Sequence, residues 1–181
     1  MDYTRTDPQN LERPSRRPNR LPGYDYSQNG AYFVTICTKG KRMLFGDVGA
    51  DSISARVVAQ TFSEVIAAAP YYTCPCFVVM PNHFHALLVI DRADMESAPT
   101  ISDLMRDFKR YSTLEYGKLV RQGAAEPYQG RLWQRSFHDH IIRNDREYRL
   151  IGEYIITNPA RWREDCFYPS VLRPVQEGRT L

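Results

Sequence analysis

The sequence lacks the long hydrophobic runs that would place it in a membrane. No apolar stretch approaches the ~20 residues that a membrane-spanning helix needs. The first 20 residues are polar and rich in Pro and Arg, without the apolar core of a signal peptide. Cysteine is scarce, with four in 181 residues, and we expect thiols rather than disulfides. These absences favour a cytoplasmic protein that has no membrane partner.

Basic residues are present in clusters, although the formal net charge is only +3. Clusters of this kind favour a polyanionic partner such as nucleic acid, while a solvated surface is the simpler alternative for any one of them. The three clusters are Arg13, Arg16, Arg17 and Arg20; then Arg106, Lys109 and Arg110; then Arg143, Arg146 and Arg149.

Hydrophobic periodicity predicts one domain with the order β-α-β-β-α-β and a final helix. This order is the α+β, ferredoxin-like plan, with an antiparallel sheet and an additional C-terminal helix. We expect a flexible Arg/Pro-rich arm over 1–22, the domain over 23–162 and an irregular tail over 163–181. The predicted strands are 31–38, 71–80, 83–90 and 131–143, and the predicted helices are 51–69, 99–113 and 144–158.

Histidines occur in two H-x-H pairs, the first within "MPNHFHALLVI" as His83 and His85. Alternate residues of a strand share one face, so each pair presents two imidazoles that suit a single metal ion. Ordinary hydrogen-bonded strand histidines are the simpler alternative. A zinc site with Cys74 and Cys76 is a third, but the Pro81-Asn82 turn predicts that Cys76 pairs beyond His85.

Tyr154 and Asn158 are four residues apart in "EYIITNP" and therefore share one helix face. If this helix crosses the sheet over His83 and His85, Asn158 offers an amide oxygen to a metal and Tyr154 places its phenol nearby. A divalent metal polarises a phosphate, so attack by Tyr154 would give a phosphotyrosine ester that can be reversed onto a new strand end. The alternative is a core tyrosine and an asparagine that ends the helix before Pro159.

Two segments, "VVMPNHFHALLVI" and "LWQRSFHDHIIRNDREYRLIGEYIITNPARW", resemble the HUH-type single-tyrosine transposases, specifically the REP-associated tyrosine transposases. The resemblance covers residues 30–162. It implies a ferredoxin-like fold and metal-dependent nicking and rejoining of single-stranded DNA through a 5′-phosphotyrosine. The implied substrates are hairpins like those of repetitive extragenic palindromes.

Carried over residue by residue, the resemblance makes His83 and His85 the metal ligands, with Phe84 as the hydrophobe between them. Tyr154 becomes the nucleophile and Asn158 the third ligand. The implied cofactor is Mg²⁺ or Mn²⁺, for which Asn158 and phosphate oxygens supply the hard ligands.

The resemblance gives His140 and Arg143 DNA-contacting or site-supporting roles. His138 stands where relatives often have an aromatic residue, which disfavours a second metal site. A monomer or homodimer, nucleoid-associated, is expected, and a non-catalytic module that binds DNA or RNA hairpins is the main alternative. Phosphate contacts are expected from Arg106, Lys109 and Arg110, and from Arg16, Arg17 and Arg20 in the arm.

Overall fold

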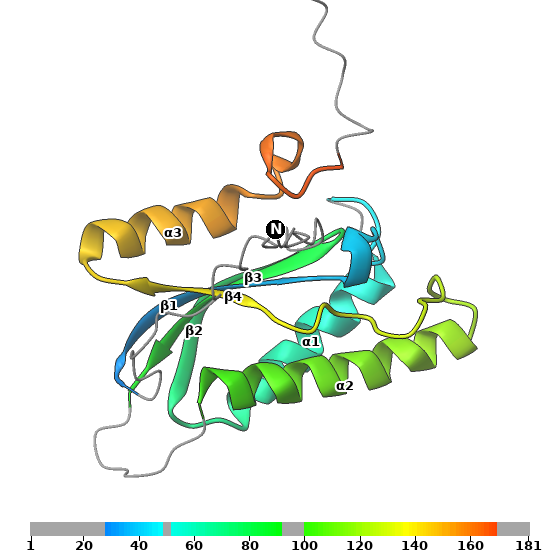
Figure 1. Cartoon of the computed structure of the whole chain (residues 1–181), viewed down its shortest axis with the longest axis horizontal. Helices are drawn as coiled ribbons and strands as arrows, with labels where there is room; N and C mark the ends of the chain where they lie inside the picture. The colour runs from blue at the N-terminus through cyan, green and yellow to red at the C-terminus, as the bar shows by residue number, and fades with distance from the viewer. Residues whose placement is uncertain (1–27, 49–51, 92–99, 170–181) are drawn as a thin grey trace, which may run out of the picture.

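The centre of the molecule is a four-stranded antiparallel sheet (Figure 1). This computed structural model describes residues 28–48, 52–91 and 100–169, so the arm over 1–22 with Arg16, Arg17 and Arg20 lies outside the described residues. The strand order β2-β3-β1-β4 confirms the ferredoxin-like α+β plan. The strands are β1 (Gly30–Cys37), β2 (Tyr72–Met80), β3 (His83–Ile90) and β4 (His138–Ile142).

Helices cover both faces of the sheet (Figure 1). Helices α1 and α2 lie together on one face, and α3 lies on the other. Two short 3₁₀ turns, η1 and η2, follow β1 and α3. No helix in the described part of the chain is both long enough and apolar enough to cross a bilayer. The bounds are α1 (Ile53–Ala67), α2 (Ile101–Arg121), α3 (Asp145–Thr157), η1 (Lys39–Lys41) and η2 (Trp162–Glu164).

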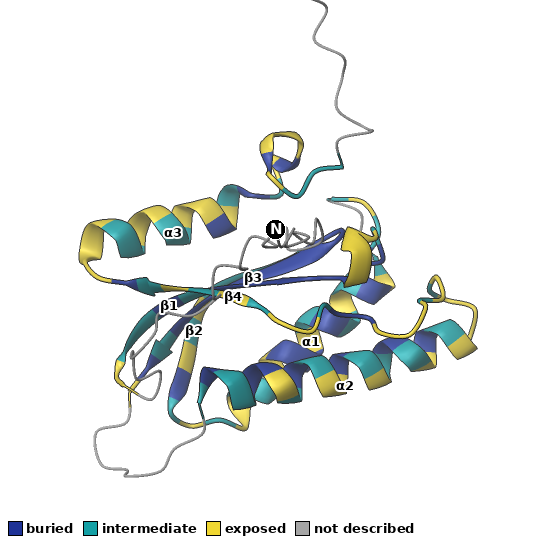
Figure 2. Cartoon of the chain, viewed as in Figure 1, coloured by how far each residue is buried: buried dark blue, intermediate teal, exposed yellow. Residues whose placement is uncertain are grey.

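The main core lies between the sheet and the pair α1 and α2, where buried positions are concentrated (Figure 2). Phe84, Ala86 and Leu88 of β3 point into it and are fully buried. The Phe84 ring packs against Phe62 of α1 and Phe108 of α2, with centroids 4.6 and 4.9 Å apart. Because side chains alternate along a strand, this packing directs His83 and His85 to the opposite face, toward α3.

The hairpin of β2 and β3 turns at Pro81-Asn82, as the sequence predicts, and pairs Met80 with His83. Cys76 pairs with Leu87, beyond His85, which confirms the expected register. A register shift between Thr73 and Cys76 changes the alternation in β2. Cys74 therefore packs against the core on the α1 and α2 side, whereas Cys76 packs on the α3 side. Neither cysteine joins the histidines, so the zinc hypothesis is wrong.

Local capping fixes where the helices begin. The Ser52 side chain caps α1, and Thr100 and Asp103 form a reciprocal capping box at the start of α2. Asn144 caps α3 by accepting a hydrogen bond from the Glu147 N–H. The α3 helix ends at Thr157, just before Asn158 and Pro159.

Two boundaries differ from the sequence prediction by more than two residues. The predicted strand over 131–143 is regular only from His138, because Leu132 and Trp133 are buried as part of a loop, with one bridge from Trp133 to Thr38. The α2 helix continues eight residues past Thr113 to Arg121, because buried Tyr116 and Leu119 extend its apolar face.

Candidate active site

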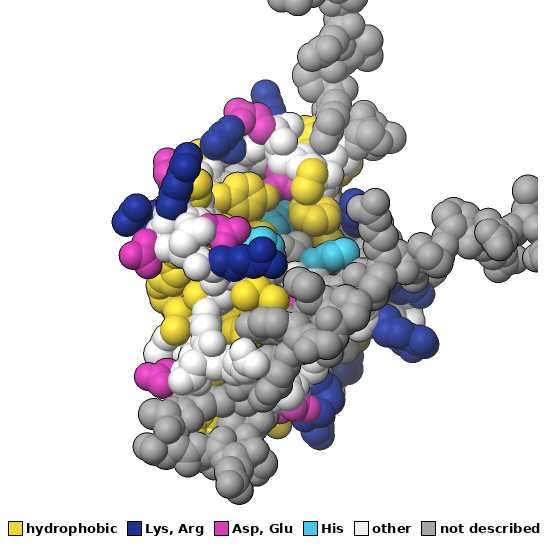
Figure 3. All heavy atoms as spheres, turned by 60° about the vertical axis from the view of Figure 1, so that its left-hand side comes forward, with side chains coloured by type: hydrophobic (Ala, Val, Ile, Leu, Met, Phe, Trp, Pro, Cys, Tyr) yellow, Lys and Arg dark blue, Asp and Glu magenta, His cyan; other side chains and the backbone are white. Residues whose placement is uncertain are grey.

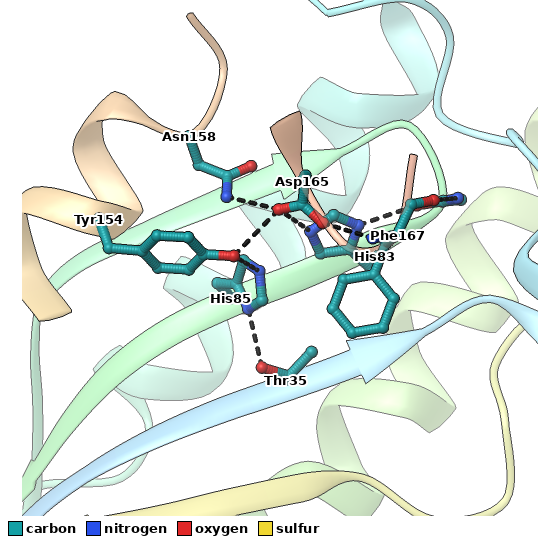
Figure 4. Close-up of polar contacts among 8 residues, drawn as sticks. Thr35, His83, His85, Tyr154, Asn158, Asp165 and Phe167 are labelled. Carbon is teal, nitrogen blue, oxygen red and sulfur yellow. Dashed lines mark hydrogen bonds and ion pairs between the residues drawn. The ribbon is translucent and has the colours of Figure 1, made fainter. Parts of the chain in front are cut away.

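His83 and His85 lie side by side beneath α3 and form the base of the site (Figure 4). Their ring centroids are 4.5 Å apart, and their exposed fractions are 0% and 1%. Burial lowers the pKa of His83 to about 4 and that of His85 to about 3. Both imidazoles are therefore neutral at pH 7, which is the form that binds a metal.

Asn82 sets the tautomer of His83. The Asn82 side-chain nitrogen donates to the carbonyl oxygens of Lys41 and Phe167, so its Oδ1 faces His83 Nδ1 at 2.8 Å. An amide oxygen only accepts, so Nδ1 carries the proton and Nε2 keeps a free lone pair. The Nδ1 of His85 is held in a similar way by the Thr35 hydroxyl, at 2.8 Å. Partners of this kind orient metal-binding histidines.

Asp165 is a site residue that sequence reasoning missed. It follows η2, in the segment expected to be an irregular tail, and is 5% exposed. Its Oδ2 lies 2.9 Å from the Tyr154 hydroxyl, 2.7 Å from Asn158 Nδ2 and 3.9 Å from His83 Nε2. Burial opposes ionisation, but hydrogen bonds from Asn158 and the Phe167 N–H outweigh it and hold the Asp165 pKa below its usual value.

Tyr154 projects from α3 over the histidines, as predicted. Its hydroxyl donates to Asp165 Oδ2 and lies 3.4 Å from His85 Nε2. The ring stands edge-on to Phe33, and the residue is 38% exposed. Burial and the adjacent Asp165 charge raise the pKa of this phenol well above its ordinary value. The hydroxyl is thus well placed, but it stays protonated without further help.

The donor set fits a divalent cation. Ligand atoms of His83, His85 and Asp165 all lie within 4.8 Å of one another, and no other such cluster occurs among the described residues. Two buried atoms of this site have no hydrogen-bond partner among the described residues, namely His83 Nε2 and Asn158 Oδ1. Leaving a buried polar atom unpaired costs about 1–3 kcal/mol, which a bound cation at His83 Nε2 would remove. Asn158 donates its side-chain N–H to Asp165 Oδ2 at 2.7 Å (Figure 4), and its role as a metal ligand stays a prediction.

The predicted DNA contacts on α2 lie on the sheet face opposite the histidines (Figure 1). Arg106 pairs with Asp103 at 2.6 Å and with Asp107 at 3.4 Å. Lys109 donates to the backbone carbonyls of residues 134–136 at 3.0–3.3 Å. Arg110 is exposed beside Tyr111. The structure therefore separates these three residues from the tyrosine site.

His140 and Arg143 lie at the junction of β4 and α3, and both contact Glu147. The Glu147 carboxylate lies 2.6 Å from His140 Nε2 and accepts the Arg143 backbone N–H at 2.8 Å. These hydrogen bonds lower the pKa of Glu147. They attach the first turn of α3 to the sheet, which supports the helix that carries Tyr154.

The site opens on a face of mixed character. Histidine, hydrophobic and acidic side chains lie near its middle, and several Lys and Arg side chains lie toward its edges (Figure 3). Phe167 covers His83 with centroids 4.6 Å apart, and Lys41 Nζ lies 4.8 Å above the Phe167 ring. Aromatic and cationic groups therefore surround the buried ligand cluster.

A family model for IS200-like transposases matches residues 27–158. The chain belongs to this family. It is 30% identical over 174 residues to an uncharacterized protein of Haemophilus influenzae (strain ATCC 51907 / DSM 11121 / KW20 / Rd), covering 84% of this chain and 93% of that protein. It is 20% identical over 157 residues to a REP-associated tyrosine transposase of Escherichia coli (strain K12), covering 82% of each.

The fold of this IS200-like transposase also matches a solved structure of a REP-associated tyrosine transposase bound to a REP hairpin. The TM-score is 0.54 at 22% identity, over 77% of this chain and 72% of that one. At this identity the match shows a shared fold.

Proposed function

We propose that this IS200-like transposase nicks and rejoins single-stranded DNA beside hairpins, through a 5′-phosphotyrosine on Tyr154. One observation carries the proposal: the Tyr154 hydroxyl lies within 2.9 Å of Asp165 and 3.4 Å of His85 Nε2, at a cluster suited to a cation. A buried structural tyrosine would need neither a neutral histidine pair nor a carboxylate at its hydroxyl.

The covalent step uses groups that are already in contact. The Tyr154 oxygen attacks phosphorus, the bond from phosphorus to the 3′ oxygen breaks, and the 5′ end becomes linked to the tyrosine. The phenol proton passes to Asp165, whose Oδ2 already accepts that hydrogen bond, and the departing 3′ oxygen takes a proton from water. Attack on the ester by another 3′ hydroxyl reverses these steps and joins the strands.

His83, His85 and Asp165 would hold a divalent metal such as Mn²⁺ or Mg²⁺ in this proposal. When bound, the ion polarises the scissile phosphate and stabilises charge on its oxygens. The chain keeps both imidazoles neutral through burial and keeps the free nitrogen of His83 available through Asn82. Asn158 orients the Asp165 carboxylate by donating to Oδ2 at 2.7 Å.

The substrate class rests on the relatives. A REP-associated tyrosine transposase is among the similar sequences, and a similarly folded one was solved with a REP hairpin. We therefore propose hairpins of this kind, with an unpaired flank, as the DNA on which this chain acts.

A covalent adduct tests the proposal. End-labelled hairpin DNA with a single-stranded flank is incubated with protein and Mn²⁺ and separated on a denaturing gel. We expect a protein–DNA band that is lost in Tyr154→Phe and after EDTA treatment. Tyr148→Phe, on the same helix and partly buried, is the matched control and retains the band. Hairpin binding by wild type without any adduct would instead identify a non-catalytic binding module.

A further inference from the structure

A second concave surface lies away from the tyrosine site, between α2 and the loop that leads to β4. It encloses a cavity of about 290 Å³. Four of the nine described residues that line it are basic, and none is acidic: Lys109, Arg110, Arg131 and Arg135. We call this surface the basic groove. A concave surface with one sign of charge attracts a polyanion more strongly than the net charge of +3 suggests.

Lys109 positions one wall of the basic groove. Its ammonium donates to the carbonyls of residues 134–136 and so attaches this loop to α2. Burial lowers its pKa to about 8, which leaves it mainly protonated at pH 7. Arg110, Arg131 and Arg135 are exposed, so their guanidinium groups can bind phosphate bidentately.

The 3₁₀ turn η1 connects the basic groove with the tyrosine site. The Lys39 N–H donates to the Leu132 carbonyl at 2.8 Å, and its side chain reaches Gly130 at the groove. Two residues further on, Lys41 lies over the Phe167 ring, which itself covers His83. Lys39 and Lys41, just after β1, therefore place positive charge between the basic groove and the tyrosine site.

Aromatic residues distinguish the two surfaces. The single aromatic residue among the groove's described lining is Trp133, which is 3% exposed and donates its indole N–H to Ser112. Among the lining residues of the groove, no aromatic ring is therefore exposed for an unpaired base to stack on, and the lining offers mainly positive charge. At the tyrosine site, in contrast, Tyr154 is accessible, and Phe167 and Tyr168 are partly exposed.

We propose that the basic groove binds the phosphate backbone of the paired hairpin stem, while the unpaired flank occupies the tyrosine site. This assignment rests on the proposed function, because the paired stem and the unpaired flank are the two parts of the hairpin DNA proposed there as the substrate. A duplex stem presents phosphates and hides its bases, as the groove requires, whereas an unpaired flank presents bases for aromatic contacts.

Binding measurements test the groove without requiring cleavage. Affinity of the Tyr154→Phe protein is measured by fluorescence anisotropy at several salt concentrations, on a hairpin with its flank and on the flank alone. We expect Arg131→Ala with Arg135→Ala to weaken hairpin binding and to lower its salt slope by about 2, since each lost phosphate contact removes about 0.9 from the slope. The affinity of the double variant for the flank alone stays within twofold of the value before the two arginines are replaced.

Arg121→Ala is the matched control, because Arg121 is an exposed arginine on α2 outside the groove lining. It leaves both affinities unchanged. An unchanged hairpin slope in the double variant, or equal weakening on both DNAs, would overturn the groove assignment. The double variant is also made in the protein that retains Tyr154, and its adduct formation on the flank alone reports separately on the chemistry, so failure of the groove is distinguishable from failure of the tyrosine site. Circular dichroism verifies that each variant is folded.

Discussion

Acidification should destabilise this protein well before its carboxylates are protonated. His83 and His85 are buried as neutral imidazoles, with pKa values lowered to about 4 and 3 from the usual 6.5. Between pH 6.5 and about 4, the unfolded chain therefore binds more protons than the folded chain. The free energy of unfolding falls as the pH drops through this window and is fully retained above pH 6.5.

The size of the loss follows from the two pKa shifts. Each histidine removes about 1.4 kcal/mol of stability for each pH unit below 6.5, so the pair removes about 4 kcal/mol between pH 7 and pH 5. That is a large fraction of the 5–15 kcal/mol typical of a domain. Asp165 has a lowered pKa, so its contribution is lost only at more acidic pH.

Urea unfolding in EDTA at half-unit pH steps measures this loss without bound metal. Replacing His85 by Gln should reduce the loss to about 2 kcal/mol, since only His83 remains. His138→Gln is the control, because that side chain is exposed, and it should leave the loss unchanged. A wild-type loss below 1 kcal/mol between pH 7 and pH 5 would refute the argument that both imidazoles are buried and neutral.

Three further predictions concern single contacts. Asn82→Ala should weaken Mn²⁺ binding by about 10–100-fold, measured by calorimetry, because His83 loses the partner that fixes its tautomer. Phe84→Ala should lower the free energy of unfolding by about 3–5 kcal/mol in urea, because the ring is fully buried between two helices. Ser112→Ala should lower it by about 1–3 kcal/mol, since the buried Trp133 indole N–H loses its acceptor; an unchanged unfolding midpoint would contradict this.

Short-range rules were sufficient for the parts of the site that lie within single elements. Strand alternation predicted that His83 and His85 share a face opposite Phe84, and the structure agrees. Helix periodicity predicted that Tyr154 and Asn158 share a face, and both contact Asp165. These rules depend only on neighbours in the chain, so one sequence is enough to apply them.

The part of the site that the sequence did not reveal depends on contacts between residues far apart in the chain. Asp165 enters the site because η2 reverses the chain and the Phe167 carbonyl accepts a hydrogen bond from distant Asn82. The available signal was Phe167, a large aromatic in the segment expected to be irregular, together with Trp162 directly before that segment. Lys109 was predicted to contact DNA, but sequence cannot show that its three hydrogen bonds go to backbone carbonyls.

The cover over the two imidazoles has a consequence for rates. The Nε2 atoms of His83 and His85 lie beneath Tyr154 and the segment that carries Asp165 and Phe167, so we expect a cation to reach them through a local separation of this segment from the sheet. Local openings of this kind take microseconds to seconds. The observed rate of metal binding should therefore reach a plateau as the metal concentration rises. The plateau equals the rate at which the segment around Asp165 opens.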